Sequence, residues 1–353
     1  MIGSGDTSFT YQAKKLASLR NWLVLFAGTV STIPVLHAQN WTPLGLPNGT
    51  FESIRFSDKY VYASCGRLGL YRRSRNLKEN WEFLGLRDTS AIGLGVQDVY
   101  VDEGQENIIL AAIYDRSPGG IGIKKSTDGG TSWFPSIAGF DTTDYGHPAT
   151  SLIGVRRNHS TVVYACHGYH HRVHKSINLG DSWTSPLNLR SEGHFLCMAV
   201  SQSSGLLMAG GGDAEFSPTL FGSIDSGRTW SRIRLEGGGD NSFSAIAFSP
   251  HDESVVVVVM GWGFVYQSRD RGKTWKMILE ESNRGFTNVA FDSKRQGHVF
   301  VSGSALYESF DLGNTWYTHL VPGDGLITAI AWDSRSLNLW VGVKDVGIFS
   351  FSP

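Results

Sequence analysis

Apolar and polar residues alternate in short runs along residues 39–353, and each run is followed by one that is almost wholly apolar. The clearest unit begins with SFSAIAFSP at 242–250 and continues with SVVVVVM at 254–260, FVYQS at 264–268 and TWKMIL at 274–279. Alternation with a period of two predicts a strand with one exposed face, and a short continuous apolar run predicts a strand buried on both faces. The unit is therefore expected to be a sheet of four short strands.

Inner strands of the alternating kind recur seven times along the chain. Their sequences are ESIRFS, DVYVD, LIGVR, HFLCMAVS, SFSAIAFSP, FTNVAFD and LITAIAW. The seventh unit supplies three strands, and NWTPLG at 40–45 has the pattern of the missing outer strand. We therefore expect an all-β fold, a seven-bladed β-propeller at residues 39–353, in which the N-terminal strand closes the last blade and removes its free edge.

A turn motif, Ser-x-Asp/Asn-x-Gly-x-Ser/Thr-Trp, lies between the third and fourth strand in five of these units, and a weaker copy ends at Trp81. The five tryptophans stand at 133, 183, 230, 275 and 316, so the period is about 40 to 50 residues, the size of one propeller blade. The acidic or amide side chain of each motif is expected to accept hydrogen bonds from its own turn, and the indole to pack between blades. These structural residues are Asp128, Asn178, Asp225, Asp270 and Asp311.

This motif resembles the Asp-box, or BNR repeat, of sialidases, sortilin-type receptors, xyloglucanases and the photosystem II assembly factor propellers. Arg55 is not followed by the Ile-Pro of the sialidase motif, and the xyloglucanases place their carboxylates between two tandem propellers. The resemblance is therefore closest to the single-propeller family of the photosystem II assembly factors, which implies binding of a partner protein. That family's basic patch has a loose analogue in Arg67, Arg72, Arg73 and Arg75.

Residues 1–38 have a different composition from the rest of the chain. Lys14, Lys15 and Arg20 precede an apolar run of about fifteen residues that ends in small residues near Ala38, which is the arrangement of a secretory signal peptide. The run is too short and too often interrupted for a stable membrane span. We therefore expect an exported protein, periplasmic or extracellular, with no membrane span once the signal peptide is removed.

Charge and cysteine content narrow the possible partners. The chain has 31 Lys and Arg, 32 Asp and Glu and a formal net charge of -1, which disfavours a nucleic-acid surface and disorder. Cys65, Cys166 and Cys197 are expected to be buried free thiols, because a propeller of this size does not need disulfides. We expect a monomeric propeller whose partner is a protein or a glycan.

Functional residues are expected on the face opposite the repeated turns, in the connections from second to third strand and from blade to blade. Aromatic rings, imidazoles and guanidinium groups in these connections suit a polar ligand such as a glycan or a peptide. Trp262 is the sharpest candidate, because it lies between two glycines on a short turn. The candidate ligand-binding residues are Arg67, Tyr145, His147, Tyr169, His170, Arg190, His194, Trp262 and Arg284.

Four histidines, His167, His170, His171 and His174, fall within eight residues. They lack an H-x-H or H-E-x-x-H pattern, and their rings should point in different directions around a tight turn. We therefore expect a solvated, pH-responsive loop, and neither a metal site nor a cofactor.

Two functions from different classes remain open. The first is an exported, non-catalytic scaffold that binds a protein or glycan on the loop-rich face, for example in the assembly of an envelope complex. The second is a carbohydrate-active enzyme, a glycoside hydrolase or sialidase-like protein, that uses carboxylates such as Asp144, Glu192, Asp213 or Asp240. Glycosidases need two carboxyl groups about 5 to 10 Å apart across a cleft.

Overall fold

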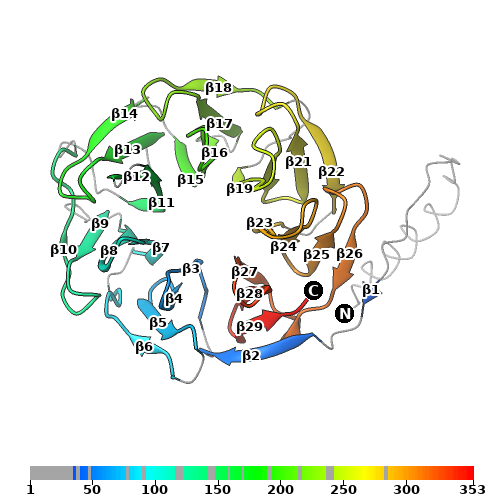
Figure 1. Cartoon of the computed structure of the whole chain (residues 1–353), viewed down its shortest axis with the longest axis horizontal. Coiled ribbons are helices and arrows are strands. Elements are labelled where there is room, and N and C mark those ends of the chain that lie inside the picture. Colours follow the sequence, from blue (N-terminus) through cyan, green and yellow to red (C-terminus); the bar gives the residue numbers. More distant parts are fainter. Residues whose placement is uncertain are drawn as a thin grey trace, which may run out of the picture. The chain divides into compact units, whose positions relative to one another are not determined.

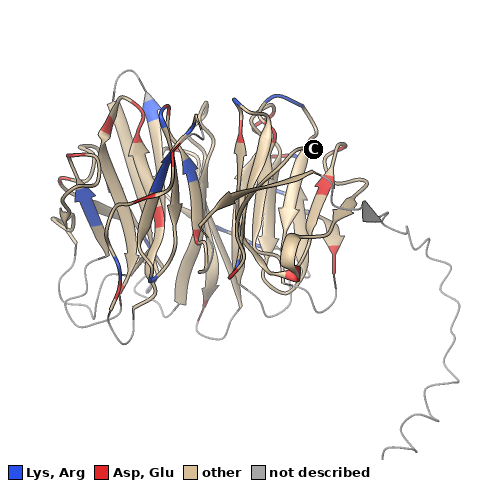
Figure 2. Ribbon diagram, turned by 90° about the horizontal axis from the view of Figure 1, so that it is seen from below, with Lys and Arg blue, Asp and Glu red and all other residues tan. Residues whose placement is uncertain are grey.

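The structure is a computed structural model that describes residues 35–36, 40–46, 49–76, 79–89, 93–115, 122–140, 148–157, 160–168, 171–188, 193–213, 217–235, 242–281 and 285–353. Its strands form seven antiparallel sheets arranged as blades around a central axis (Figure 1). Seen from the side, the strands of the propeller run between two ends that carry the turns, and charged residues of both signs lie on strands and turns alike (Figure 2). The predicted seven-bladed propeller is confirmed.

Each blade is a simple meander in which consecutive strands pair from the inner to the outer strand. The first three blades are β3 (Ser53–Phe56), β4 (Tyr60–Ser64), β5 (Leu70–Ser74) and β6 (Glu82–Phe83); β7 (Gly95–Asp102), β8 (Gln105–Tyr114), β9 (Ile123–Ser126) and β10 (Phe134–Pro135); and β11 (Ala149–Arg157), β12 (Ser160–His167), β13 (Arg172–Ser176) and β14 (Thr184–Asn188). Blades four and five are β15 (Gly193–Val200), β16 (Leu207–Asp213), β17 (Pro218–Ser223) and β18 (Ser231–Ile233); and β19 (Phe243–Phe248), β20 (Val256–Met260), β21 (Phe264–Ser268) and β22 (Lys276–Glu280).

The last two blades each include a strand from the beginning of the chain. Blade six consists of β23 (Asn288–Phe291), β24 (Val299–Ser302), β25 (Leu306–Ser309) and β26 (Tyr317–His319), and β1 (Val35–Leu36) adds to β26 in parallel. A short 3-10 turn, η2 (Pro322–Asp324), leads into blade seven, which consists of β27 (Ile327–Asp333), β28 (Asn338–Val343), β29 (Gly347–Phe351) and β2 (Trp41–Gly45).

Ring closure depends on β2, which pairs antiparallel with β29 and places Trp41 opposite Phe351. The two rings pack with their centroids 4.8 Å apart. Ion pairs between Arg75 and Asp333 and between Arg335 and Asp58 also join blade one to blade seven, at the same end of the strands. Closure of the last blade by the N-terminal strand, as predicted, removes the free edge that blade seven would otherwise present.

The hydrophobic core lies between neighbouring blades rather than inside any one sheet. Tyr164 and Cys166 of blade three, for example, belong to the same buried cluster as Phe195 and Leu207 of blade four. All three cysteines are buried free thiols, as expected. Each blade thus depends on both of its neighbours for burial of its apolar side chains, which is why an open ring would be unstable.

The repeated turns share one set of hydrogen bonds. In the second blade, Ser126 Oγ donates to Asp128 Oδ1 (2.8 Å) and accepts from the amide of Gly130 (2.8 Å), and Asp128 Oδ1 accepts from the amide of Ser132 (2.9 Å). Hydrogen bonds from Ser132 and Ser126 lower the pKa of Asp128 to about 2. The same serine-centred bonds recur around Asn178, Asp225, Asp270 and Asp311.

The tryptophan that ends the motif connects blades. Trp133 Nε1 donates to the carbonyl of Leu84 in the preceding blade (2.8 Å), and Trp316 Nε1 donates to that of Ile278 (3.0 Å). The carbonyls concerned belong to outer strands or to residues directly after them. The carboxylates of these turns are therefore engaged in their own turns, at separate places around the ring.

Blade six encloses a chain of buried ionisable groups. His298 lies between two carboxylates, with Nδ1 at 2.9 Å from Asp292 Oδ2 and Nε2 at 2.7 Å from Glu308 Oε1. His319 Nε2 contacts the second oxygen of Glu308 at 2.8 Å. Burial raises the pKa of Glu308, but the hydrogen bonds from the two histidines outweigh it and the net shift is downward.

Candidate functional site

The connections from second to third strand and from blade to blade meet at one end of the propeller, which we call the loop face. Short backbone hydrogen bonds join them: the amide of Val96 donates to Gly66 (3.0 Å), that of Ile327 to Gly303 (2.9 Å) and that of Lys344 to Leu326 (2.9 Å). The repeated turns lie at the other end, because each follows a third strand. On the loop face these bonds join described connections of blade one to blade two and of blade six to blade seven.

Each inner strand begins at the loop face, and near its start the inner strands share one irregularity in their pairing. In five blades the pairing of the inner strand shifts by one residue at Gln97, Thr150, Leu196, Ser244 or Thr328, as in a β-bulge. Blades one and six repeat it, because the amide of Glu52 bonds to Ser64 while Ser53 pairs with Ser64, and Thr287 and Asn288 meet Ser302 in the same way. These seven equivalent residues form what we call the entry ring: Glu52, Gln97, Thr150, Leu196, Ser244, Thr287 and Thr328.

Four hydroxyl groups of the entry ring bind the next blade. Thr150 donates to the carbonyl of Phe195 (2.7 Å), Ser244 to that of Phe286 (3.1 Å) and Thr287 to that of Ile327 (2.8 Å). Thr328 accepts from the amide of Phe51 (3.2 Å), which carries the series across the junction between blades seven and one. These hydroxyls therefore have a structural role that accounts for their position.

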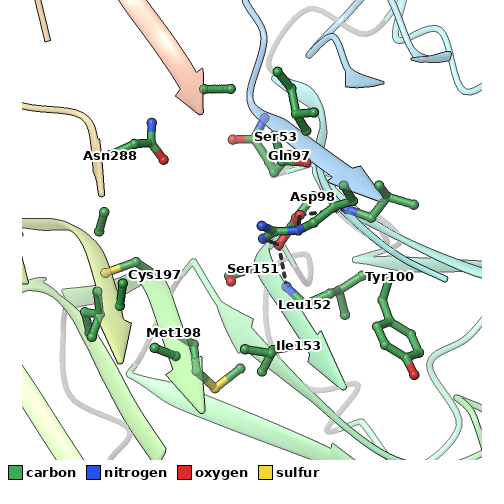
Figure 3. A pocket seen from close by; sticks show the side chains of 18 of the residues that line it. Ser53, Gln97, Asp98, Tyr100, Ser151, Leu152, Ile153, Cys197, Met198 and Asn288 are labelled. Atoms are coloured by element: carbon green, nitrogen blue, oxygen red, sulfur yellow. Dashed lines mark hydrogen bonds and ion pairs between the residues drawn. The ribbon is translucent and has the colours of Figure 1, made fainter. Parts of the chain in front are cut away.

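Below the entry ring, the central channel holds a cavity of about 460 Å³ lined by the inner strands of all seven blades (Figure 3). Its charged lining residues in the described part of the chain are Glu52, Arg55, Asp98 and Glu103. The described lining of the cavity therefore carries three carboxylates and one guanidinium group, an excess of negative charge.

Asp98 joins three blades. Its carboxylate accepts two hydrogen bonds from the guanidinium of Arg55, at 3.0 and 2.7 Å, and one from the amide of Leu152 at 3.0 Å (Figure 3). Burial lowers the pKa of Arg55, but the charge and hydrogen bonds of Asp98 outweigh it and the net shift is upward. Bidentate pairs of this kind are strong and directional, so Asp98 is a structural brace and its carboxylate is fully engaged.

Glu52 is the charged member of the entry ring. Its side chain is half-buried and lines the cavity beside the turn after β4, where a Cβ built on Gly66 would lie 3.3 Å from Oε1. Burial raises the pKa of Glu52 to about 7. Burial and the nearby Glu52 also raise the pKa of the Cys65 thiol to about 12, so this thiol stays neutral. Among the described residues the carboxylate has neither a hydrogen-bond nor an ion-pair partner.

Three of the predicted ligand-binding residues lie in the described part of the chain. Arg67 is exposed on the turn after β4, next to Gly66 and therefore close to Glu52. Trp262 is 74% exposed on the turn between β20 and β21. His194 is half-buried at the start of β15, with Nε2 at 3.4 Å from Ser242 Oγ. The other six lie outside the described residues: Tyr145, His147, Tyr169, His170, Arg190 and Arg284.

Of the four predicted catalytic carboxylates, only Asp213 is described, since Asp144, Glu192 and Asp240 lie outside the described residues. Asp213 Oδ1 accepts a hydrogen bond from the amide of Ser217 at 2.8 Å, within the connection between β16 and β17. The charges of Asp213 and His194 both act on His171. The structure therefore brings the two predicted site residues Asp213 and His194 close to one another.

The histidine-rich segment differs from its prediction. His167, His171 and His174 are buried, so the expectation of a solvated loop is wrong for these three, and His170 lies outside the described residues. The ring of His174 stacks on Phe140 with centroids 3.9 Å apart, and burial is the main cause that lowers the pKa of His171. The reason is that β13 begins at Arg172 and pairs with β12, which takes the segment into the blade. Across the described residues, no group of three or more His, Cys, Asp or Glu side chains is placed to hold a metal ion.

The arginines that follow Arg67 serve the propeller itself. Arg72 pairs with Glu82 at 2.6 Å, and Arg73 Nη1 donates to the carbonyl of Leu44 at 2.7 Å. Arg75 forms the ion pair with Asp333 that joins blades one and seven. These contacts account for three of the four arginines that offered a loose analogue of a basic patch.

Glu52 and the entry ring were not among the predicted site residues. The signal is present in the sequence, because Glu52 follows a buried apolar residue, Phe51, as Thr150 follows Ala149 and Thr328 follows Ile327. An alignment of the seven inner strands on that buried residue places one carboxylate in a ring of otherwise uncharged side chains.

Comparison with known proteins identifies similar folds. No family model and no curated protein matches the chain. Among solved structures, YCF48 bound to D1 peptide has a TM-score of 0.66 at 16% identity, covering 91% of this chain and 100% of that one. YCF48 from Cyanidioschyzon merolae has a TM-score of 0.64 at 16% identity, covering 89% and 99%. The GH74 xyloglucanase from Xanthomonas campestris has a TM-score of 0.55 at 13% identity, covering 86% of this chain and 59% of its own.

At these identities the likeness establishes the fold. The propeller matches the whole of the YCF48 chains and only part of the larger GH74 enzyme. In the described part of the chain, no helix has the length and apolar character needed to cross a bilayer.

Proposed function

We propose that this protein is an exported, non-catalytic propeller that binds a protein or glycan ligand on its loop face, in the assembly of an envelope complex. The observation that carries the proposal is Trp262, whose indole is 74% exposed on a turn of the loop face. Exposed aromatic side chains on a rigid scaffold are typical anchors of binding surfaces. The signal-like residues 1–38 support export.

Two further observations favour binding over catalysis. A glycosidase needs two available carboxyl groups. In the channel, Arg55 and backbone amides already engage Asp98, so on the described inner strands Glu52 has no second carboxylate beside it for catalysis. The YCF48 structure that is similar to 91% of this chain was solved with a bound D1 peptide. A peptide ligand is therefore the preferred form of the proposal.

The test is a screen of the purified full chain against peptide and glycan arrays, followed by Trp262→Ala. We expect the variant to bind its ligand more weakly by about 1 to 3 kcal/mol, the usual contribution of an aromatic hot spot, with an unchanged melting temperature. Phe134→Ala is the matched control, because Phe134 is also an exposed aromatic residue but lies on the outer strand β10. Loss of binding in the Phe134 variant and not in the Trp262 variant would place the ligand elsewhere and refute the proposal.

A carbohydrate-active enzyme is the second candidate, favoured by the similarity to GH74 propellers. This chain covers 59% and 45% of the two GH74 chains, so it corresponds to about half of such an enzyme. Release of reducing sugar from xyloglucan by the purified chain, lost in Asp213→Asn, would support this candidate over the first.

A further inference from the structure

The entry ring is asymmetric in a way that its structural role does not explain. Thr150, Ser244, Thr287 and Thr328 use their hydroxyls to bind the next blade, and Gln97 Nε2 donates to the carbonyl of Leu94. Glu52 occupies the equivalent place in blade one and makes no such bond. A neutral polar side chain would suit the position better, since an ionised carboxylate loses hydration there without gaining a partner.

Among the described residues, no cationic side chain pairs with Glu52. Arg55, the guanidinium of the channel lining, is bound in two places to Asp98. The neighbouring Cys65 is a neutral thiol, and burial alone accounts for the shifted pKa of Glu52. Arg67 and Asp88 on the adjoining connections have interactions of their own. The channel mouth therefore presents a negative group that is complementary to a cation from outside.

Two exposed apolar side chains border the same place. Leu68 belongs to the turn that contains Gly66, and its amide bonds to Cys65. The carbonyl of Leu94 lies 3.3 Å from a Cβ built on Gly66, the distance at which Oε1 of Glu52 also lies. Leu68 is 38% exposed and Leu94 is 52% exposed. A ligand with an aliphatic stem and a cationic end could contact both leucines and the carboxylate at once.

We propose that the channel mouth beside Glu52 binds the cationic side chain of a lysine or arginine residue from a partner polypeptide. The proposal rests on the proposed function, that the loop face binds a protein, and it assigns the chemistry of one subsite. The carboxylate meets the charged head, Leu68 and Leu94 contact the stem, and the cavity of about 460 Å³ below leaves room for the head and its water.

Binding of the cationic side chain beside Glu52 should become tighter as the pH rises. The carboxyl is largely protonated below pH 7 and ionised above it, because its pKa is about 7. A cation binds the ionised form, so affinity should rise about tenfold from pH 6 to pH 8, and binding near neutral pH should release a proton.

The experiment compares two small probes that differ in charge, Nα-acetyl-lysine methylamide and Nα-acetyl-norleucine methylamide. NMR titration of the full chain at pH 8 should show that the lysine probe binds at least ten times more tightly than the norleucine probe. In Glu52→Gln this preference should disappear, whereas Glu281→Gln, which removes a carboxyl from the loop face near Trp262, should keep it. Melting temperatures establish that each variant is folded.

Two results would overturn the inference: equal binding of both probes by the wild-type chain, or an undiminished lysine preference in Glu52→Gln. Failure of the proposed function has a different signature. If an array peptide binds and is weakened by Trp262→Ala while the lysine preference is absent, the loop face binds a protein but Glu52 is not its cationic subsite. If the lysine preference is present while no array peptide binds, the subsite stands and the protein-binding function fails.

Discussion

Replacing Glu52 by glutamine should stabilise the propeller, and the gain should appear only as the pH rises. The folded state raises the pKa of this carboxyl from 4.5 to about 7 because the group is buried without a partner. Between these values the folded protein keeps the proton and the unfolded chain loses it, so the folded state binds more protons and stability falls with increasing pH. The sign is therefore opposite to that of a carboxylate held in an ion pair.

The magnitude follows from the size of the shift. Two to three pKa units correspond to about 3 to 4 kcal/mol, and water at the open mouth of the channel reduces this to about 2 to 3 kcal/mol above pH 8. Glutamine has a similar shape and does not ionise. Near pH 4 the variant and the wild type should be nearly equal in stability, and the variant should gain most of the difference between about pH 4.5 and pH 7.

Urea unfolding followed by tryptophan fluorescence at pH 4, 5, 6, 7 and 8 measures this difference. Glu281→Gln is the control and should show no pH-dependent gain. A Glu52→Gln chain that is no more stable than the wild type at pH 8, or whose gain is the same at pH 5, would show that the carboxylate has a partner or is well hydrated. The reasoning behind the cationic subsite would then be refuted as well.

Two predictions concern the propeller itself. Ser268→Ala should lower the free energy of unfolding by about 1 to 3 kcal/mol without affecting the lysine preference, because it leaves the buried amide of Gly272, now bonded to Ser268 Oγ at 2.7 Å, without an acceptor; an unchanged urea midpoint would contradict this. Deletion of residues 40–45 should lower the melting temperature and produce oligomers in size-exclusion chromatography, because β29 would become a free edge. A monomeric variant with an unchanged melting temperature would contradict the closure of the ring through β2.

The fold could be predicted from the sequence because its signals are repeated. Each inner strand alternates, each second strand is apolar and the turn motif marks the end of the third strand, so an uncertain reading of one blade is corrected by the others. The closing strand followed from the same comparison, since Trp41 and Leu44 have the pattern of an outer strand and the seventh unit lacks one.

The site was less accessible because it depends on contacts between blades. Periodicity alone does not identify a bulged residue, so the strand pairing was needed to show that the position after the buried apolar residue is equivalent in Glu52, Thr150 and Thr328. The prediction of a solvated histidine loop was wrong for a similar reason. A run of imidazoles next to a glycine turn suggested solvent exposure, whereas His174 is covered by Phe140, which lies 34 positions earlier in the chain. Long-range packing of this kind is absent from any local pattern.

The channel mouth combines two kinds of side chain that obey different constraints. Hydroxyls at the entry ring satisfy backbone groups of the next blade and so stabilise the ring whatever the protein binds. Glu52 has no such role, and its burial costs stability that a neutral residue at the same place would not cost. A residue that weakens a fold at one position of a repeated structure is best explained by function, because packing alone would favour an uncharged residue, as in the other six blades. Glu52 meets this criterion, whereas Asp98, which is equally charged and more deeply buried, does not, since its partners in three blades account for it fully.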